Sequence, residues 1–338
     1  MKTQTRTPIS QIGKFGLIER ISGALTHKEP ATLQGVGADG AAILYQEPVT
    51  VSAQVLFLEG VHFDLTYTPL QHLGYKAVVR ALGQVMAMNA MPRHLLIVAG
   101  CSRRFFVEDV ESLFQGVEAA CTEYGAEVAA LDFESSYTGL TISITAIGES
   151  SSATLATPAG GQSTDLLCLT GNVGAAYMGL QLLEREKALF SSAQKAQPQL
   201  SGKEYILQRY LRPQLRKELF TILNRQEVAP TSMCFLTHGL AHGVQALAHA
   251  SGCGAKVYVD KIPIASKTFE MAQELNFDAL MCALNGGEDY EFLFTVPVSI
   301  HETVARELPV DIIGHLCDAA LGTLLVTPEG DALPLSTI

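Results

Sequence analysis

Two glycine-rich segments of the sequence have the composition of phosphate-binding loops. Residues 35–40 read Gly-Val-Gly-Ala-Asp-Gly, and residues 170–174 read Thr-Gly-Asn-Val-Gly between a predicted strand and a predicted helix. Glycines let backbone N–H groups approach phosphate oxygens, and a carboxylate beside them can bind a metal ion. The second segment also lies at a helix N-terminus, which attracts anions. A plain turn and an ordinary helix start are the alternatives.

A histidine and an acidic turn are further candidates for contact with a ligand. His62 follows Gly60 at the end of a predicted strand, where its ring could bond a phosphate or a substrate ring. Residues 285–291 read Asn-Gly-Gly-Glu-Asp-Tyr-Glu, and two adjacent glycines suggest a close approach of ligand or backbone. The acids of this turn could hold a cation or a cationic ring. For both segments a purely structural role is the alternative.

Three clustered arginines and one pair of histidines are the remaining candidates for binding a ligand or a metal ion. Arg209, Arg212 and Arg216 surround a proline that ends a helix, and they either clamp a phosphate or pair with acids. His238 and His242 are four residues apart on a predicted helix, a spacing that can chelate zinc. No third ligand lies nearby in the sequence, which favours a solvated or core role for the pair.

The elements that position these residues alternate between strands and helices, and the sequence predicts an α/β or α+β fold of two domains. A small and polar stretch from residue 149 to 164 is the best candidate for a linker, and we place the boundary near residue 155. The domains are therefore 1–155 and 156–338. Helices are predicted at 12–25, 70–88, 107–124, 175–187, 204–210, 217–225, 240–250, 269–275 and 300–308. Strands are predicted at 41–45, 51–58, 94–100, 127–131, 140–148, 166–170, 256–260 and 291–296, with two more at the end.

Composition excludes several classes of function. Of the 338 residues 48% are hydrophobic and 17% are charged, which suits packed interiors and leaves little for disorder. The formal net charge of −11 argues against a nucleic-acid partner. No apolar run is long enough to span a membrane, and the polar start lacks the core of a signal peptide, so we expect a cytoplasmic protein. The seven scattered cysteines argue against a disulfide framework and a thiolate zinc site.

Taken in order, eight segments of the sequence resemble the thiamine-monophosphate kinases of the aminoimidazole-ribonucleotide-synthetase-like superfamily. The resemblance runs from about residue 8 to 328, and the ordered set is specific although no single segment is. The segments are Phe15-Gly-Leu-Ile-Glu, Glu59-Gly-Val-His-Phe, Gly74-Tyr-Lys-Ala, Ala87-Met-Asn-Ala-Met-Pro, Leu140-Thr-Ile-Ser-Ile-Thr-Ala-Ile-Gly-Glu, Thr170-Gly-Asn-Val-Gly, Leu211-Arg-Pro and Gly286-Gly-Glu-Asp-Tyr-Glu.

The resemblance implies a fold, a reaction and a set of site residues. The N-terminal domain, which would bind ATP, would pair across a homodimer into a β-barrel, and the C-terminal domain would be a glycine-rich α/β domain. The family transfers the γ-phosphoryl group of ATP to thiamine phosphate, with Mg²⁺ neutralising the charge. The substrate-binding residues it implies are His62, Gly287, Glu288 and Asp289. The nucleotide-binding residues are Gly37, Asp39 and Asp132, of which Asp39 and Asp132 would also bind the metal.

Five of the seven carboxylates that the family uses for magnesium are missing by this alignment. Val55, Gln84, Phe235 and His238 stand where acids are expected, and one acid beside Asp39 is also absent. Leu131 replaces a glycine next to Asp132, and no aromatic residue near the C-terminus matches the one that closes over thiamine. Fold resemblance does not by itself carry activity.

Three functions therefore stay open. In the first, the chain is a working kinase with an altered metal site built from Asp39, Asp132 and Glu134. In the second, it is a non-catalytic homologue that binds a nucleotide or thiamine phosphate, or that regulates an active subunit. It could also activate a different small substrate with ATP.

Overall fold

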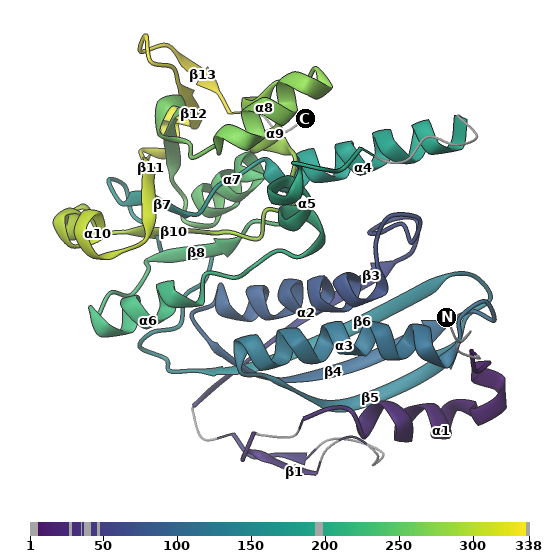
Figure 1. Cartoon of the computed structure of the whole chain (residues 1–338). Coiled ribbons are helices and arrows are strands. Elements are labelled where there is room, and N and C mark those ends of the chain that lie inside the picture. Colours follow the sequence, from purple (N-terminus) through teal and green to yellow (C-terminus); the bar gives the residue numbers. More distant parts are fainter. Residues whose placement is uncertain are drawn as a thin grey trace. The chain divides into compact units, whose positions relative to one another are not determined.

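The computed structural model describes residues 6–26, 29–34, 36, 42–45, 48–192 and 199–335. The chain divides into two units, which we call the first and the second unit (Figure 1). The first unit consists of Met1–Met86 and Ala90–Ala153, and the second consists of Ala87–Asn89 and Thr154–Ile338. Each unit has its own sheet and its own helices.

The first unit is built on a four-stranded sheet of order β3-β6-β4-β5, in which only β4 and β5 run parallel. Its helices are α1 (Ile9–Ser22), α2 (Leu70–Met86) and α3 (Val107–Tyr124). The strands are β3 (Val49–Leu58), β4 (Met91–Cys101), β5 (Glu127–Ser135) and β6 (Leu140–Ser150), with β1 (Thr32–Gln34) and β2 (Ala42–Ile43) forming a separate ribbon.

Helices α2 and α3 lie side by side on one face of this sheet (Figure 1). They touch backbone to backbone at two glycines. A Cβ atom on Gly74 would lie 2.0 Å from the carbonyl oxygen of Leu113, and one on Gly116 would lie 1.8 Å from that of Gln71. No larger side chain fits at either position, which gives Gly74 of the segment Gly74-Tyr-Lys-Ala a packing role.

Within the described ranges, the opposite face of the sheet has no helix layer like that of α2 and α3. Along β6 the buried and partly exposed residues alternate, as the predicted period of two requires. The register aligns Leu56, Ser143, Val98 and Asp132 in one row across the four strands. Leu56 is 47% exposed and Val98 46% exposed. We call this surface the open face; near β5, helix α1 packs against the strand.

The second unit contains a seven-stranded sheet of order β13-β12-β9-β11-β7-β10-β8, in which β9 and β12 form the parallel pair. Its strands are β7 (Leu166–Thr170), β8 (Ser232–Phe235), β9 (Gly254–Tyr258), β10 (Phe292–Val296), β11 (Val310–Cys317), β12 (Thr323–Val326) and β13 (Ala332–Pro334). The helices are α4 (Ala175–Ser192), α5 (Glu204–Leu211), α6 (Lys217–Arg225), α7 (Leu240–Ala250), α8 (Ser266–Leu275), α9 (Ala279–Asn285) and α10 (His301–Glu307).

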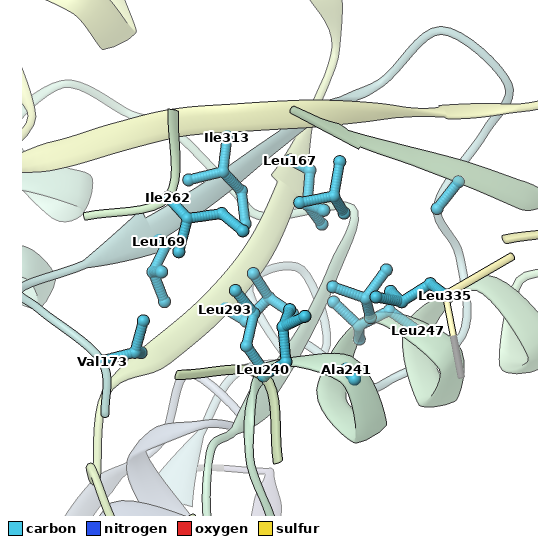
Figure 2. Close-up of a cluster of buried hydrophobic side chains, with 14 of the residues drawn as sticks. Leu167, Leu169, Val173, Leu240, Ala241, Leu247, Ile262, Leu293, Ile313 and Leu335 are labelled. Atoms are coloured by element: carbon cyan, nitrogen blue, oxygen red, sulfur yellow. The ribbon is translucent and has the colours of Figure 1, made fainter. Parts of the chain in front are cut away.

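The main core of the second unit lies between α7 and the sheet (Figure 2). Leu240, Ala241 and Leu247 of α7 face Leu167 and Leu169 of β7. The buried apolar area supplies most of the driving force for folding. Because β7 lies between β10 and β11, the loop that leaves its carboxyl end is fixed on both sides.

Most of the predicted elements agree with the structure, and the differences have local causes. The bounds predicted for 107–124, 166–170, 217–225 and 240–250 are confirmed. Helix α4 extends beyond the predicted residue 187, and β5 extends beyond 131 because it pairs with β4 along its whole length. Three elements were not predicted, β1, β8 and α9, and three strands follow α10 where two were predicted.

All seven cysteines are unbridged, in agreement with the prediction of no disulfide framework. Burial raises the pKa of the Cys168 and Cys234 thiols to about 12, so both stay protonated and behave as small apolar groups. Within the described ranges, no helix combines the length and the apolar character that crossing a membrane would require.

Candidate functional site

Asp132 lies on β5, and its carboxylate forms an ion pair with a lysine from α1. Lys14 Nζ is 2.8 Å from Asp132 Oδ1 and 2.7 Å from Glu134 Oε1. The two acids are two residues apart on β5, so both project from the open face. Their hydrogen bonds to the ammonium group raise the pKa of Lys14. The structure thus joins Asp132 to Glu134, as the altered-metal-site hypothesis requires, but with a cation supplied by the chain.

The other predicted members of this site, Gly37 and Asp39, lie outside the described residues, as does most of the loop at 35–40. The predicted roles of Asp39 and Asp132 in binding metal and nucleotide therefore stay predictions.

A cavity of about 1150 Å³ opens beside Glu134 in the first unit. It lies between α1 and the carboxyl ends of β4 and β5, the end of parallel strands at which α/β proteins commonly bind ligands. Lys14 and Arg103 contribute positive charge to its wall, and Phe105 and Tyr137 contribute aromatic rings. Cations and flat apolar surfaces suit a phosphorylated ring compound.

His62 lies in the turn after β3, and the backbone fixes its ring. The Leu58 N–H donates to His62 Nδ1 at 3.1 Å, so a neutral ring carries its proton on Nε2. The ring also packs at a tilt on Phe57, with centroids 5.7 Å apart. The strand end positions His62 as the sequence predicts, and its contact with a substrate stays a prediction.

Asp289 is fully buried and binds the start of helix α4. Gly174 N–H donates to its Oδ2 at 2.8 Å, and Ala176 N–H donates to its Oδ1 at 3.3 Å. The helix N-terminus predicted as a phosphate site at 170–174 thus already holds a carboxylate from the same chain. Burial nevertheless raises the pKa of Asp289 to about 7.

Glu291, two residues further on, sits between two of the clustered arginines. Arg209 Nη2 donates to Glu291 Oε1 at 2.9 Å, and Arg216 Nη2 donates to the same oxygen at 3.1 Å. Thr170 Oγ1 donates to Oε2 at 2.6 Å. Of the two alternatives for the arginines, the structure favours pairing with an acid for Arg209 and Arg216. Arg212 lies exposed at the helix end.

Gly287 and Glu288 form the turn between α9 and β10 with left-handed backbone angles, φ 76° and φ 57°. The Glu288 N–H donates to the Thr237 carbonyl oxygen at 3.1 Å, which ties this turn to the loop after β8. Glu288 is partly exposed, whereas the neighbouring Asp289 is buried. Their predicted contact with thiamine phosphate stays a prediction.

The prediction that His238 and His242 share a helix is wrong. Helix α7 begins at Leu240, and Gly239 precedes it with φ 97°, a conformation that excludes His238 from the helix. The two rings still approach each other, with centroids 5.3 Å apart, and His238 Nδ1 lies 2.8 Å from Thr237 Oγ1.

Of three positions at which the resemblance expects acids, two are integrated into the packing. Val55 is buried on the helix-facing side of β3, where it pairs with Ile144 of β6. Phe235 stacks on Tyr290 with ring centroids 5.3 Å apart and also contacts Phe292. Gln84 lies partly exposed on α2. Apolar side chains therefore fill two of the places where carboxylates would be.

The described residues do not fit a magnesium site. Magnesium prefers near-octahedral oxygen ligands. Among the described ranges, no group of three or more His, Cys, Asp or Glu side chains is placed to hold a metal ion. The carboxylate pair of β5 holds an ammonium group instead. Sequence reasoning missed Lys14, although it directly precedes the segment Phe15-Gly-Leu-Ile-Glu.

Comparisons with known proteins agree on the fold and the family. Residues 37–150 match the family model "AIR synthase related protein, N-terminal domain". The thiamine-monophosphate kinase of Aquifex aeolicus is 28% identical over 86% of this chain and 87% of its own length. That of Bacillus subtilis is 27% identical over 95% and 97%. The crystal structure of thiamine-monophosphate kinase from Stenotrophomonas maltophilia has a TM-score of 0.77 at 25% identity, covering 94% and 96% of the chains.

Two further structures extend the fold comparison. AaThiL complexed with AMPPCP and TMP has a TM-score of 0.71 at 24% identity, covering 98% of this chain and 99% of that one. Crystals of the hydrogenase maturation protein HypE from E. coli gave a structure with a TM-score of 0.74 at 16% identity, covering 95% and 96%. The fold is thus that of the AIR synthase related proteins, with a mixed α/β architecture and two main sheets. Among proteins of this fold, the chain is similar in sequence and structure to the thiamine-monophosphate kinases over most of its length.

Proposed function

We propose that this chain is a ligand-binding homologue of the thiamine-monophosphate kinases that binds a nucleotide or thiamine phosphate and transfers phosphate weakly or not at all. The observation that carries this proposal is the filling of expected acid positions by packed side chains. Val55 is 5% exposed, and Phe235 is stacked on Tyr290. Neither side chain can bind a metal ion or orient a water molecule that does.

The chemistry of phosphoryl transfer makes these losses severe. Catalysis of this reaction consists almost entirely of positioning and of neutralising the charge on the phosphates. Losing one supporting interaction of a metal ligand already costs roughly 10–100-fold in metal affinity or activity. The loss of several direct ligands is expected to reduce turnover further.

Ligand binding is supported by the cavity of the first unit. Lys14 and Arg103 would meet a phosphate group, and Phe105 and Tyr137 offer surfaces for a ring. AaThiL has been crystallised with AMPPCP and TMP, and this chain shares its fold. We therefore expect the nucleotide to bind here, beside Asp132.

Calorimetry and a coupled kinase assay together test the proposal. We expect AMPPCP or thiamine phosphate to bind, while ATP, Mg²⁺ and thiamine phosphate give little or no turnover even at high enzyme concentration. Arg103→Gln should weaken AMPPCP binding about tenfold, the loss expected for one charged contact. The matched control is Arg225→Gln in α6, a 63% exposed arginine of the second unit. Turnover at the rate of an active relative would establish a working kinase, and absence of binding by either ligand would remove the binding role.

We also propose that two copies of this chain pair through the open face of the first unit. The family resemblance implies a homodimer at this sheet, and the exposed Leu56 and Val98 lie on either side of Ser143 on the open face. Exposed apolar side chains on the face of a sheet are suited to contact with an identical copy.

Sedimentation measurements on two matched valine variants test the dimer. Val98→Glu places a charge on the open face and should weaken dimerisation at least tenfold, because burying an unpaired carboxylate is unfavourable. Val298→Glu changes a valine of the second unit and should leave the dimer intact. Val298 is 52% exposed, which is close to the 46% of Val98. A wild-type protein that sediments as a monomer at micromolar concentration would refute the proposal.

A further inference from the structure

The carboxylate pair of β5 is held by an ammonium group from a distant part of the chain. Lys14 comes from α1, whereas Asp132 and Glu134 lie about one hundred and twenty residues later, on β5. Lys14 Nζ lies within 2.8 Å of both carboxylates, and the Phe133 N–H donates to the same Oδ1 of Asp132. One cation thus bridges two acids, at hydrogen-bond distance from each.

The backbone before Lys14 departs from helical geometry at this place. Gly13 has φ 70° and ψ −179°, which breaks the regular path of α1 directly before the lysine. A residue with a side chain would be strained in that conformation. Gly13 and Lys14 both line the cavity of the first unit. The kink therefore lies where Lys14 forms part of the wall of this cavity.

We propose that Lys14 is a tethered cation that occupies the Asp132–Glu134 pair and excludes divalent metal ions from it. An anionic ligand in the cavity would then meet the ammonium group of Lys14 instead of a metal ion. A divalent ion at Asp132 would lie within a few ångströms of a like charge, and it would have to displace both contacts of the lysine. The role of Lys14 is independent of whether the chain transfers phosphate.

Titration with Mn²⁺ in the absence of nucleotide, followed by electron paramagnetic resonance of the free ion, tests this role. The wild type should show no Mn²⁺ binding that depends on Asp132. Lys14→Met should increase Mn²⁺ affinity roughly tenfold or more, the size of effect seen when neighbours of a metal ligand change. Lys14→Arg keeps the cation and should behave like the wild type. Adding Asp132→Asn and Glu134→Gln to Lys14→Met should abolish the gain.

Two outcomes would overturn the proposal. One is Mn²⁺ binding by the wild type that Asp132→Asn weakens and Lys14→Met leaves unchanged. The other is a folded Lys14→Met variant that gains no affinity. Because these readouts need neither ATP nor turnover, they are separate from the tests of the proposed function.

Acetylation of folded protein gives a second readout that retains Lys14. In the Asp132→Asn, Glu134→Gln double variant, the acetylation rate of Lys14 should rise several-fold over the wild type, as measured by mass spectrometry. Lys267, an exposed lysine paired with Glu270, is the internal control and should not change. Equal rates for Lys14 in both proteins would show that the two carboxylates do not hold it.

Discussion

Replacing Glu291 with Ala should lower the free energy of unfolding by about 3–5 kcal/mol, the cost of removing one partner from a buried ion pair. The Glu291 side chain is 0% exposed and accepts hydrogen bonds from Arg209, Arg216 and Thr170. Arg209 is only 10% exposed, so its charge would remain in the interior without a counterion. Few other single substitutions in the second unit should cost as much.

Urea denaturation followed by circular dichroism measures this cost, and Glu270→Ala is the matched control. Glu270 pairs with Lys267 on the surface, at side-chain exposures of 61% and 57%. Surface pairs of this kind contribute about 0–1 kcal/mol. Glu291→Gln should fall between the two because it keeps the shape and loses the charge. A loss below about 1 kcal/mol for Glu291→Ala would show that the buried cluster is not a stabilising unit.

Asp289 should make the stability of the protein fall as the pH rises from about 4 to about 7. Its pKa is raised from 3.8 to about 7, with burial as the largest cause. Over this interval the folded state keeps a proton that the unfolded state has lost. The stabilising contribution is complete below the unfolded pKa and is lost as the pH rises through the folded pKa. At about 1.4 kcal/mol per unit, the loss is of the order of 4 kcal/mol.

The comparison of wild type with Asp289→Asn isolates this effect. The variant has no titrating group at this position, so the difference in unfolding free energy, wild type minus variant, should decrease steadily between pH 4 and pH 7. Above pH 7 the difference should become constant. Curves that stay parallel over the whole range would mean that Asp289 is already ionised in the folded protein at pH 4.

Local patterns in the sequence predict those parts of the fold that local interactions determine. Residues 107–124 have a helical period with acids in the first turn, and residues 166–170 form an apolar run of strand length, so both bounds are confirmed. Strand β8 has only four residues and depends on its pairing with β10. Helix α9 has seven residues, too few for a helical period to be distinguished from a turn.

Contacts between distant parts of the chain explain why the site was harder to predict. The sequence identifies Asp289, Arg209 and Thr170 as candidates, but it does not show that they meet in one buried cluster. The position of Lys14 beside Asp132 likewise depends on how α1 packs on β5. Gly239 did contain a signal, since a glycine before an apolar helix often marks its start. The predicted helix range of 240–250 is consistent with this signal and leaves His238 outside α7.

The contact of α2 with α3 has a consequence for how this protein can change over evolutionary time. Backbone atoms at Gly74 and Gly116 have no rotamers, so this helix pair cannot absorb a change of volume by moving side chains. The pair acts as a rigid support beneath the sheet. We therefore expect substitutions that adapt the protein to a new ligand in α1 and in the loop after β5. Gly13 allows a bend in α1, and Tyr137 of the loop projects into solvent.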